Sequence, residues 1–384
     1  MGVHARRRLL AILVVVVTTA AIWLVAFRDG EDGAPAPQPA RGVSGSVASL
    51  VRDLSPAEQV SQVLLLGFDG TDQSSPIFET LRSEELGGVL IGAQNWIDRE
   101  QGSALAGALR ATGLSGKRTA PLIVATQEGG PYRSFADMPP DATQLQIGDA
   151  GSIPGAERWA LETGEALRAA GIDLNLFPVA DVATLDSPIA DRAFSDDPAV
   201  AAPMTAAAVR GCRAARIACA AIHFPGLGAA SQDTNQGPAT VSLDAASLAD
   251  RDLQAFRAAF DERAPAVGLS LSFYAAYDPV TPGALSEPVT TGLLRDELGY
   301  DGLAITDDLG AGAIKAGYQV PEATVAAIAA GADMVQIASP DDQRGVREAL
   351  LEAVRTGAID EARLAEAAGR VLELKRSQGL RPLR

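Results

Sequence analysis

The chain has 384 residues, of which 47% are hydrophobic and 5% aromatic, and its formal net charge at pH 7 is −16. This length and apolar content suit one large α/β domain, because barrels of that class commonly run to about 250 residues or more. The negative charge would repel a phosphate backbone and no Lys/Arg cluster outside the N-terminus offsets it, so we exclude nucleic acid as a partner.

The N-terminal segment has the pattern of a membrane anchor. Three arginines at positions 6–8 precede a largely apolar run at residues 9–27, and about 20 such residues are needed to cross the hydrocarbon core. Acidic residues follow this run, so the positive-inside rule places the rest of the chain outside the cytoplasm. We therefore expect residues 1–28 to be a basic stub and single-pass anchor in the cell membrane. The alternative is a cleaved signal peptide and a secreted protein.

Two further segments follow the predicted anchor. Residues 29–46 consist largely of Gly, Ala, Pro and acidic residues with nothing to bury, which is typical of a linker. Residues 47–384 form the predicted globular domain, in which short apolar runs alternate with longer amphipathic ones. This alternation indicates parallel strands connected by helices.

The predicted strands are apolar runs at residues 63–67, 88–91, 122–126, 174–179, 218–223, 267–273, 303–306 and 334–337. The predicted helices lie at residues 102–112, 156–170, 199–214, 248–263, 293–298, 321–330, 346–355 and 359–378. This order predicts a single TIM-type (β/α)8 barrel as the fold. In such barrels the reacting groups come from the carboxyl ends of the strands and from the loops that follow them.

The few cysteines and histidines limit the possible disulfide and metal chemistry. Cys212 and Cys219 are the only cysteines, and an oxidising compartment permits a disulfide between them, with two separately buried thiols as the alternative. The only histidines are His4 and His223, and no Cys or His cluster has the spacing of metal ligands. We therefore expect no metal.

Polar residues at three predicted strand ends are candidate site residues. Asp307 and Asp308 follow the strand at 303–306, where a carboxylate either attacks an anomeric carbon, as in retaining glycosidases, or caps the next helix. His223 precedes a Gly-rich loop and either binds a ligand hydroxyl or has a structural role. Glu128 lies in a polar turn, and for it we favour hydrogen bonds to nearby backbone N–H groups over catalysis.

Taken in order, segments from about Leu50 to Leu374 resemble glycoside hydrolase family 3. Residues 87–95 are similar to the family's G-G-V-I-L-F-x-x-N, 175–182 to N-x-x-P-V-x-D-V, 192–198 to R-S-F-G-x-D-P, and 285–309 to the stretch that ends in S-D-D-L. The resemblance is to the bacterial β-N-acetylglucosaminidase (β-N-acetylhexosaminidase) branch. It implies an O-glycosyl hydrolase without metal or organic cofactor that acts on cell-envelope glycans such as peptidoglycan fragments, and we expect a monomer.

The resemblance also implies roles for individual residues. The first Asp of the S-D-D motif is the family's nucleophile, and Asp307 occupies that position. In this branch a His held by an Asp donates the proton; Asp233 matches the Asp, but Asn235 replaces the His. Three further residues match motif positions and are expected to bind the substrate: His223, Arg192 and Glu128.

Several other positions depart from the family pattern. Ile222 replaces a Lys, Leu227 and Leu271 replace His residues, and Thr126 replaces an Asp that holds sugar hydroxyls. Pro131 and Ser134 replace two arginines. An Asn cannot deliver a proton at neutral pH, and positioned general acids contribute about 10² to 10⁴ in rate. The family's ordinary reaction is therefore not expected.

Three hypotheses remain open from the sequence. The first is a glycosidase of altered specificity that keeps Asp307 and uses another donor, such as Asp233, Asp308 or Glu128. The second is a pseudoenzyme that binds a glycan or a protein with the same cleft. The third is a structural barrel whose cleft is plugged by side chains of Leu227, Leu271 and Tyr132.

Overall fold

The computed structural model describes residues 42–380. The predicted anchor at residues 1–28 and residues 29–41 of the predicted linker lie outside this range. Within residues 42–380, no helix combines the length and the apolar character needed to cross a bilayer.

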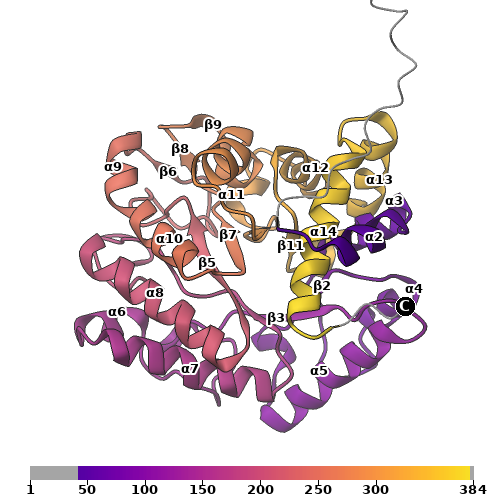
Figure 1. Ribbon diagram of the computed structural model, residues 1–384, viewed down its shortest axis with the longest axis horizontal. Helices are drawn as coiled ribbons and strands as arrows, with labels where there is room; N and C mark the ends of the chain where they lie inside the picture. The colour runs from indigo at the N-terminus through magenta and orange to yellow at the C-terminus, as the bar shows by residue number, and fades with distance from the viewer. Residues whose placement is uncertain (1–41, 381–384) are drawn as a thin grey trace, which may run out of the picture. The chain divides into compact units, whose positions relative to one another are not determined.

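A ring of parallel strands forms the centre of the domain (Figure 1). The eight strands, in chain order, are β1 (Leu64–Leu66), β2 (Gly88–Leu90), β3 (Leu122–Ala125), β4 (Leu174–Asn175), β5 (Ala218–Phe224), β7 (Ala266–Leu269), β10 (Leu303–Thr306) and β11 (Val335–Ile337). Consecutive strands in this order pair from β1 through β10, and β1 also pairs with β11. An isolated bridge between Ile305 and Met334 completes the ring. The nearly closed parallel barrel confirms the predicted TIM-type fold.

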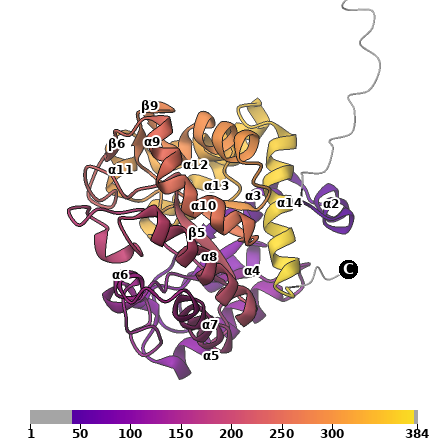
Figure 2. The same cartoon turned by 60° about the vertical axis from the view of Figure 1, so that its left-hand side comes forward.

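Helices surround this barrel (Figures 1 and 2). They are α2 (Gly45–Arg52), α3 (Pro56–Gln62), α4 (Ile77–Ser83), α5 (Arg99–Leu114), α6 (Gln144–Asp149), α7 (Ile153–Ala169), α8 (Pro198–Ala215), α9 (Ala245–Asp250), α10 (Asp252–Asp261), the π-helix η5 (Pro288–Glu297), α11 (Gly312–Lys315), α12 (Val320–Ala330), α13 (Val346–Thr356) and α14 (Glu361–Ser377). The helix predicted at 248–263 is in fact two helices, because Arg251 has a non-helical backbone with φ −114° and ψ −95°. The predicted helix at 293–298 is only the end of η5.

Two predicted strands are shorter than expected. The strand predicted at 174–179 ends at Asn175, before Pro178, which lacks the N–H that a sheet ladder needs. The strand predicted at 267–273 ends at Leu269, and Phe273 instead begins β8 (Phe273–Tyr274). That strand forms a small separate sheet with β6 (Thr240–Val241) and β9 (Asp278–Pro282), built from the loops that follow β5 and β7. In the sequence, Ser270 and Ser272 alternate with apolar residues up to Phe273 as they would in one longer strand, which hid this change of partner.

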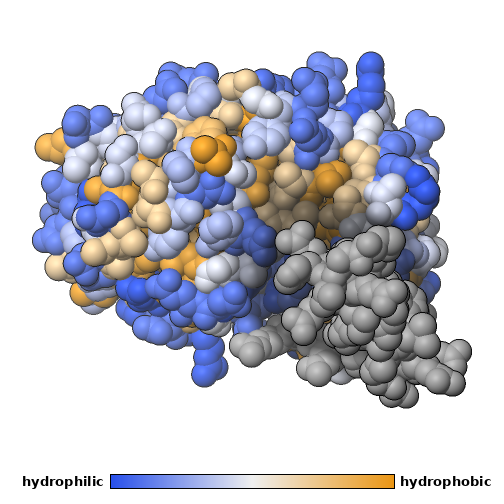
Figure 3. Space-filling model, turned by 90° about the horizontal axis from the view of Figure 1, so that it is seen from above, coloured by the Kyte–Doolittle hydropathy of each residue, from blue (hydrophilic) through white to orange (hydrophobic). Residues whose placement is uncertain are grey.

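Alternation along the strands divides the core into two shells. On β3, Leu122 and Val124 pack inside the barrel, whereas Ile123 and Ala125 pack against the helices. The same alternation sends Ile305 of β10 into the barrel interior. Ile222 and Ile305 of this inner shell also line the candidate site, so the apolar interior continues up to the carboxyl ends of the strands. On the outer surface shown in Figure 3, apolar residues are scattered among hydrophilic ones.

The two cysteines lie in this core as free thiols. Cys212 belongs to α8 and Cys219 to β5, and both are buried. Contact with Cys219, together with burial, raises the pKa of the Cys212 thiol well above its ordinary value. Of the two alternatives left open by the sequence, the structure therefore has the buried thiols.

Candidate active site

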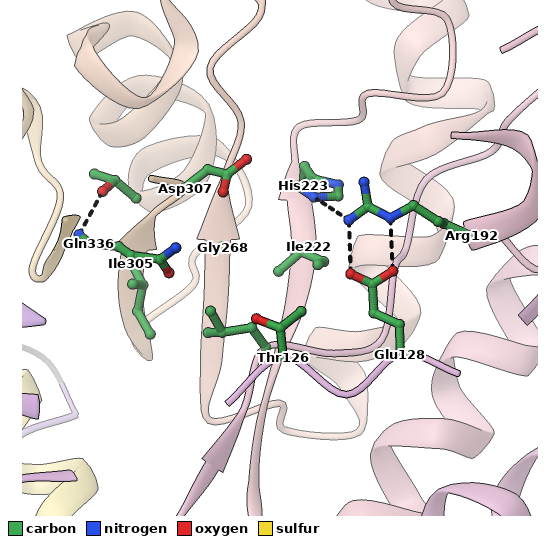
Figure 4. A pocket seen from close by; sticks show the side chains of 11 residues that line it. Thr126, Glu128, Arg192, Ile222, His223, Gly268, Ile305, Asp307 and Gln336 are labelled. Carbon is green, nitrogen blue, oxygen red and sulfur yellow. Dashed lines mark hydrogen bonds and ion pairs between the residues drawn. The ribbon is translucent and has the colours of Figure 1, made fainter. Parts of the chain in front are cut away.

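A pocket opens at the carboxyl ends of the barrel strands (Figure 4). Its empty volume, including the opening to solvent, is about 390 Å³, which is near the lower end of the range for small-molecule sites. The lining residues are Thr126, Glu128, Leu176, Arg192, Ile222, His223, Gly268, Ile305, Thr306, Asp307 and Gln336. Most of them belong to, or directly follow, a barrel strand, so the barrel itself shapes the pocket.

Asp307 is placed as a half-buried carboxylate at the end of β10. Its backbone N–H donates to the carbonyl of Leu269 at 3.0 Å, which fixes the residue against β7. Its Oδ1 accepts a hydrogen bond from the backbone N–H of Asp308 at 2.8 Å. Within residues 42–380 its Oδ2 has no hydrogen-bond partner, and the carboxylate faces the pocket in Figure 4. Asp307 therefore has one oxygen available to a ligand.

The neighbouring Asp308 has a different role. Its Oδ1 accepts hydrogen bonds from the backbone N–H groups of Gly310 and Ala338, both at 3.0 Å. Burial raises the pKa of this carboxyl above its ordinary value. Neither aspartate caps the next helix, since α11 has Ala311 at its N-cap and no side-chain cap bond. Asp308 ties the loop after β10 to β11, and it does not line the pocket.

Glu128 and Arg192 form a buried bidentate ion pair across two loops. Arg192 Nε donates to Glu128 Oε2 and Nη2 to Oε1, each at 2.8 Å (Figure 4). Burial alone would lower the pKa of Arg192, but the Glu128 carboxylate outweighs it and the net shift is upward. The expected bonding of Glu128 to nearby backbone N–H groups is wrong; its partner is a cation from a distant loop. Both its oxygens are occupied, so Glu128 is no free proton donor.

His223 lies between Arg192 and a buried carboxylate. Its Nδ1 is 2.8 Å from Asp181 Oδ2, and its Nε2 is 3.3 Å from Arg192 Nη2. In the neutral imidazole, Nδ1–H donates to Asp181 and Nε2 accepts from Arg192. Asp181 is fully buried and also accepts from the backbone N–H of Leu227 at 2.6 Å. Asp181 therefore positions both His223 and the loop that follows it.

The surroundings of His223 predict a pH dependence. Burial acts to lower its pKa and Arg192 does the same, but the Asp181 carboxylate outweighs them and raises the pKa above the ordinary value of 6.5. A raised pKa in the folded state means that protonated His223 stabilises the fold below about pH 6.5, and that this stabilisation is lost as pH rises through the folded pKa. We expect an NMR titration of the His4→Gln variant, whose one remaining histidine is His223, to give a midpoint above 6.5 that Asp181→Asn lowers. A midpoint below 6.5 in the His4→Gln variant with Asp181 intact would contradict this assignment.

The predicted proton-donor positions lie apart from the pocket. Asp233 Oδ1 accepts hydrogen bonds from the backbone N–H of Asn235 at 2.8 Å and from its side-chain Nδ2 at 3.0 Å. The loop is held on α11, where the N–H of Gly312 donates to the Asn235 carbonyl at 3.2 Å. The two side chains thus pair with each other as the motif implies, but neither lines the pocket.

The pocket is open, so the plugged cleft expected of a purely structural barrel is wrong. Leu227 and Leu271 are buried and do not line the pocket. Tyr132 is partly exposed, and the Arg192 guanidinium carbon lies 5.9 Å from its ring centroid. None of these three side chains lines the pocket.

Sequence reasoning assigned no role to two residues of the site. Asp181 is the Asp of the N-x-x-P-V-x-D-V stretch, and only its burial next to His223 reveals what it holds. Gln336 lines the pocket from β11, and the available signal was one polar residue inside an apolar strand. Of the predicted site residues, the structure brings Asp307, His223, Arg192 and Glu128 together in the pocket.

Comparison with known proteins decides the family. Residues 57–374 match the model of the glycosyl hydrolase family 3 N terminal domain. The chain belongs to glycoside hydrolase family 3. A β-hexosaminidase of Stenotrophomonas maltophilia (strain K279a) is 33% identical over 286 residues, which cover 73% of this chain and 84% of that protein.

Two solved structures share the fold of this chain. A β-N-acetylglucosaminidase from Paenibacillus sp. str. FPU-7 is 31% identical with a TM-score of 0.82, and the match covers 85% of this chain but only 63% of that one. A β-N-acetylhexosaminidase from Beutenbergia cavernae DSM 12333 is 28% identical with a TM-score of 0.72, covering 85% of this chain and 99% of that one. The resemblance to the bacterial β-N-acetylglucosaminidase branch of family 3 is thereby confirmed.

Proposed function

We propose that this family 3 barrel binds the terminal sugar of a cell-envelope glycan in the Asp307 pocket, and that it cleaves only glycosides whose leaving group departs without protonation. The observation that carries the proposal is the free Oδ2 of Asp307 in a pocket whose other carboxylate, Glu128, is fully paired with Arg192. Relatives described as β-hexosaminidases and β-N-acetylglucosaminidases support a glycan as the ligand. The envelope location rests on the predicted anchor at residues 9–27.

The chemistry follows from which groups are free. Asp307 attacks the anomeric carbon, a bond forms between its oxygen and that carbon, and the leaving oxygen departs with the electron pair of the broken bond. Water then attacks the same carbon, the bond to Asp307 breaks with its electron pair returning to the carboxylate, and the water loses a proton to solvent as the free sugar leaves. A natural sugar leaving group needs a proton in the first of these steps. Glu128 has both oxygens bound, and Asp308 and Asp233 do not line the pocket, so none of the alternative donors considered from the sequence is in place.

The same arrangement favours a pseudoenzyme as the second candidate. Asn235 stands where a proton-donating His is needed, so a glycan with an ordinary leaving group would bind and leave unchanged. The two candidates differ in one property, which is whether Asp307 forms a covalent bond with any sugar at all.

A leaving-group series tests the proposal on the full chain. For each of a panel of sugars, N-acetylglucosamine first, kcat/KM is measured for the 2,4-dinitrophenyl, 4-nitrophenyl, phenyl and methyl β-glycosides. We expect turnover of the dinitrophenyl glycoside and a fall of about 10² to 10⁴ toward the methyl glycoside, because no acid assists departure. Equal rates across the series would overturn the missing-donor argument. No turnover with any member, together with glycan binding, would establish the pseudoenzyme instead.

A further inference from the structure

The floor of the pocket is apolar, in contrast to its charged rim. Leu176, Ile222 and Ile305 line it from the ends of β4, β5 and β10, and all three are buried. Ile222 also covers Gly268, since a Cβ added to that glycine would lie 2.4 Å from Ile222 Cγ2. The floor therefore offers a largely hydrocarbon surface to whatever enters the pocket, with the hydroxyl of Thr126 at its edge.

A buried polar atom without a partner also interrupts this surface. Gln336 is 7% exposed, lines the pocket, and points its amide into the pocket interior (Figure 4). Its Oε1 is buried and has no hydrogen-bond partner within residues 42–380. A buried acceptor without a donor is costly, so a ligand that brings an N–H or O–H to this position is favoured.

The position of Asp307 fixes which part of a sugar meets this floor. The anomeric carbon must lie at Asp307, and the leaving group must point out through the opening toward solvent. The ring therefore extends inward, and its far edge, from C4 to C6, lies on Leu176, Ile222 and Ile305 beside Gln336. A hydroxyl held against the three hydrocarbon side chains loses its hydrogen bonds to water without gaining others.

Resting on the proposed function, we propose that Ile222 and Gln336 make this pocket selective for a terminal sugar with a deoxygenated far edge, as in a 6-deoxyhexose. The methyl group at C5 of such a sugar packs on the floor where a CH₂OH would leave its hydroxyl unpaired. The adjacent 4-hydroxyl donates to Gln336 Oε1. The three apolar side chains and Gln336 thus suit one apolar group with one neighbouring donor.

Matched pairs of methyl β-glycosides test the selectivity, since the proposed mechanism does not cleave them. The pairs are the D-fucoside with the D-galactoside and the D-quinovoside with the D-glucoside, and the members of each pair differ only in the 6-hydroxyl. Dissociation constants are measured by NMR titration of the full chain. We expect the 6-deoxy member of a pair to bind about ten-fold more tightly. Ile222→Thr should reduce this ratio to near one, and Gln336→Leu should weaken both members about five-fold or more.

Controls separate the possible failures. Val280→Ala changes an exposed residue of β9 and should leave all four dissociation constants unchanged. If neither member of any pair binds the wild-type chain, the proposed glycan-binding function itself fails. If both members bind equally, the glycan function stands and the deoxy selectivity is overturned. The wild-type comparison needs no substitution, so poor folding of a variant cannot obscure it.

Discussion

Asp307→Asn is expected to lower kcat for 2,4-dinitrophenyl β-glycosides by about a thousandfold or more, because the amide cannot form the glycosyl-enzyme bond. The change is isosteric and keeps the acceptor that binds the Asp308 N–H at 2.8 Å, so the local backbone should hold. Glycan affinity, measured by NMR titration, should change only a few-fold. The expected result is therefore a variant that binds as before and no longer turns over.

Asp308→Asn is the matched control for that experiment. Asp308 carries the adjacent carboxylate, but its oxygen accepts from the Gly310 and Ala338 N–H groups, a role that an Asn oxygen can also fill. Turnover should fall by no more than a few-fold. If Asp307→Asn retains the wild-type rate, or if Asp308→Asn is as damaging, Asp307 is not the nucleophile.

Arg192→Met should reduce the free energy of unfolding by about 3–5 kcal/mol, the range for breaking a buried ion pair. The reason is that Glu128, which is 3% exposed, would be left charged and unpaired. Urea denaturation followed by circular dichroism measures the change. We expect the double variant Arg192→Met with Glu128→Gln to recover much of the loss, because the buried charge is then gone. If the double variant loses as much free energy of unfolding as the single variant, or more, the unpaired charge of Glu128 is not the cause of the destabilisation.

The fold was predictable where apolar and polar residues alternate with a fixed period. Eight apolar runs separated by amphipathic stretches yield the barrel, and residues 303–306 were predicted with the bounds that β10 has. The failures occur where the backbone changes partner while the strand-like alternation of side chains continues. Phe273 extends the alternation of Leu269, Ser270, Leu271 and Ser272, yet its N–H donates to the carbonyl of Ala239 in another loop. No local pattern marks such a change.

The site was predictable only as a set of positions. The match to the family placed Asp307, His223 and Arg192 correctly in one pocket. It could not show that Glu128 would be neutralised by Arg192, because that pairing joins loops 64 residues apart. Nor could it show that Asp233 lies outside the pocket lining, since loop placement depends on where α11 holds the backbone. A role for Gln336 was recognised only from the structure, in which its Oε1 is buried without a hydrogen-bond partner among residues 42–380.

The closure of the barrel is independent of the Asp307 side chain. The seam between β10 and β11 is held by the residues on either side of Asp307: Thr306 Oγ1 accepts from the Gln336 N–H, and Asp308 Oδ1 from the Ala338 N–H. Asp307 contributes no side-chain bond across this seam. Barrel closure and the free carboxylate are thus assigned to adjacent residues, so position 307 can be substituted without breaking the bonds that close the ring.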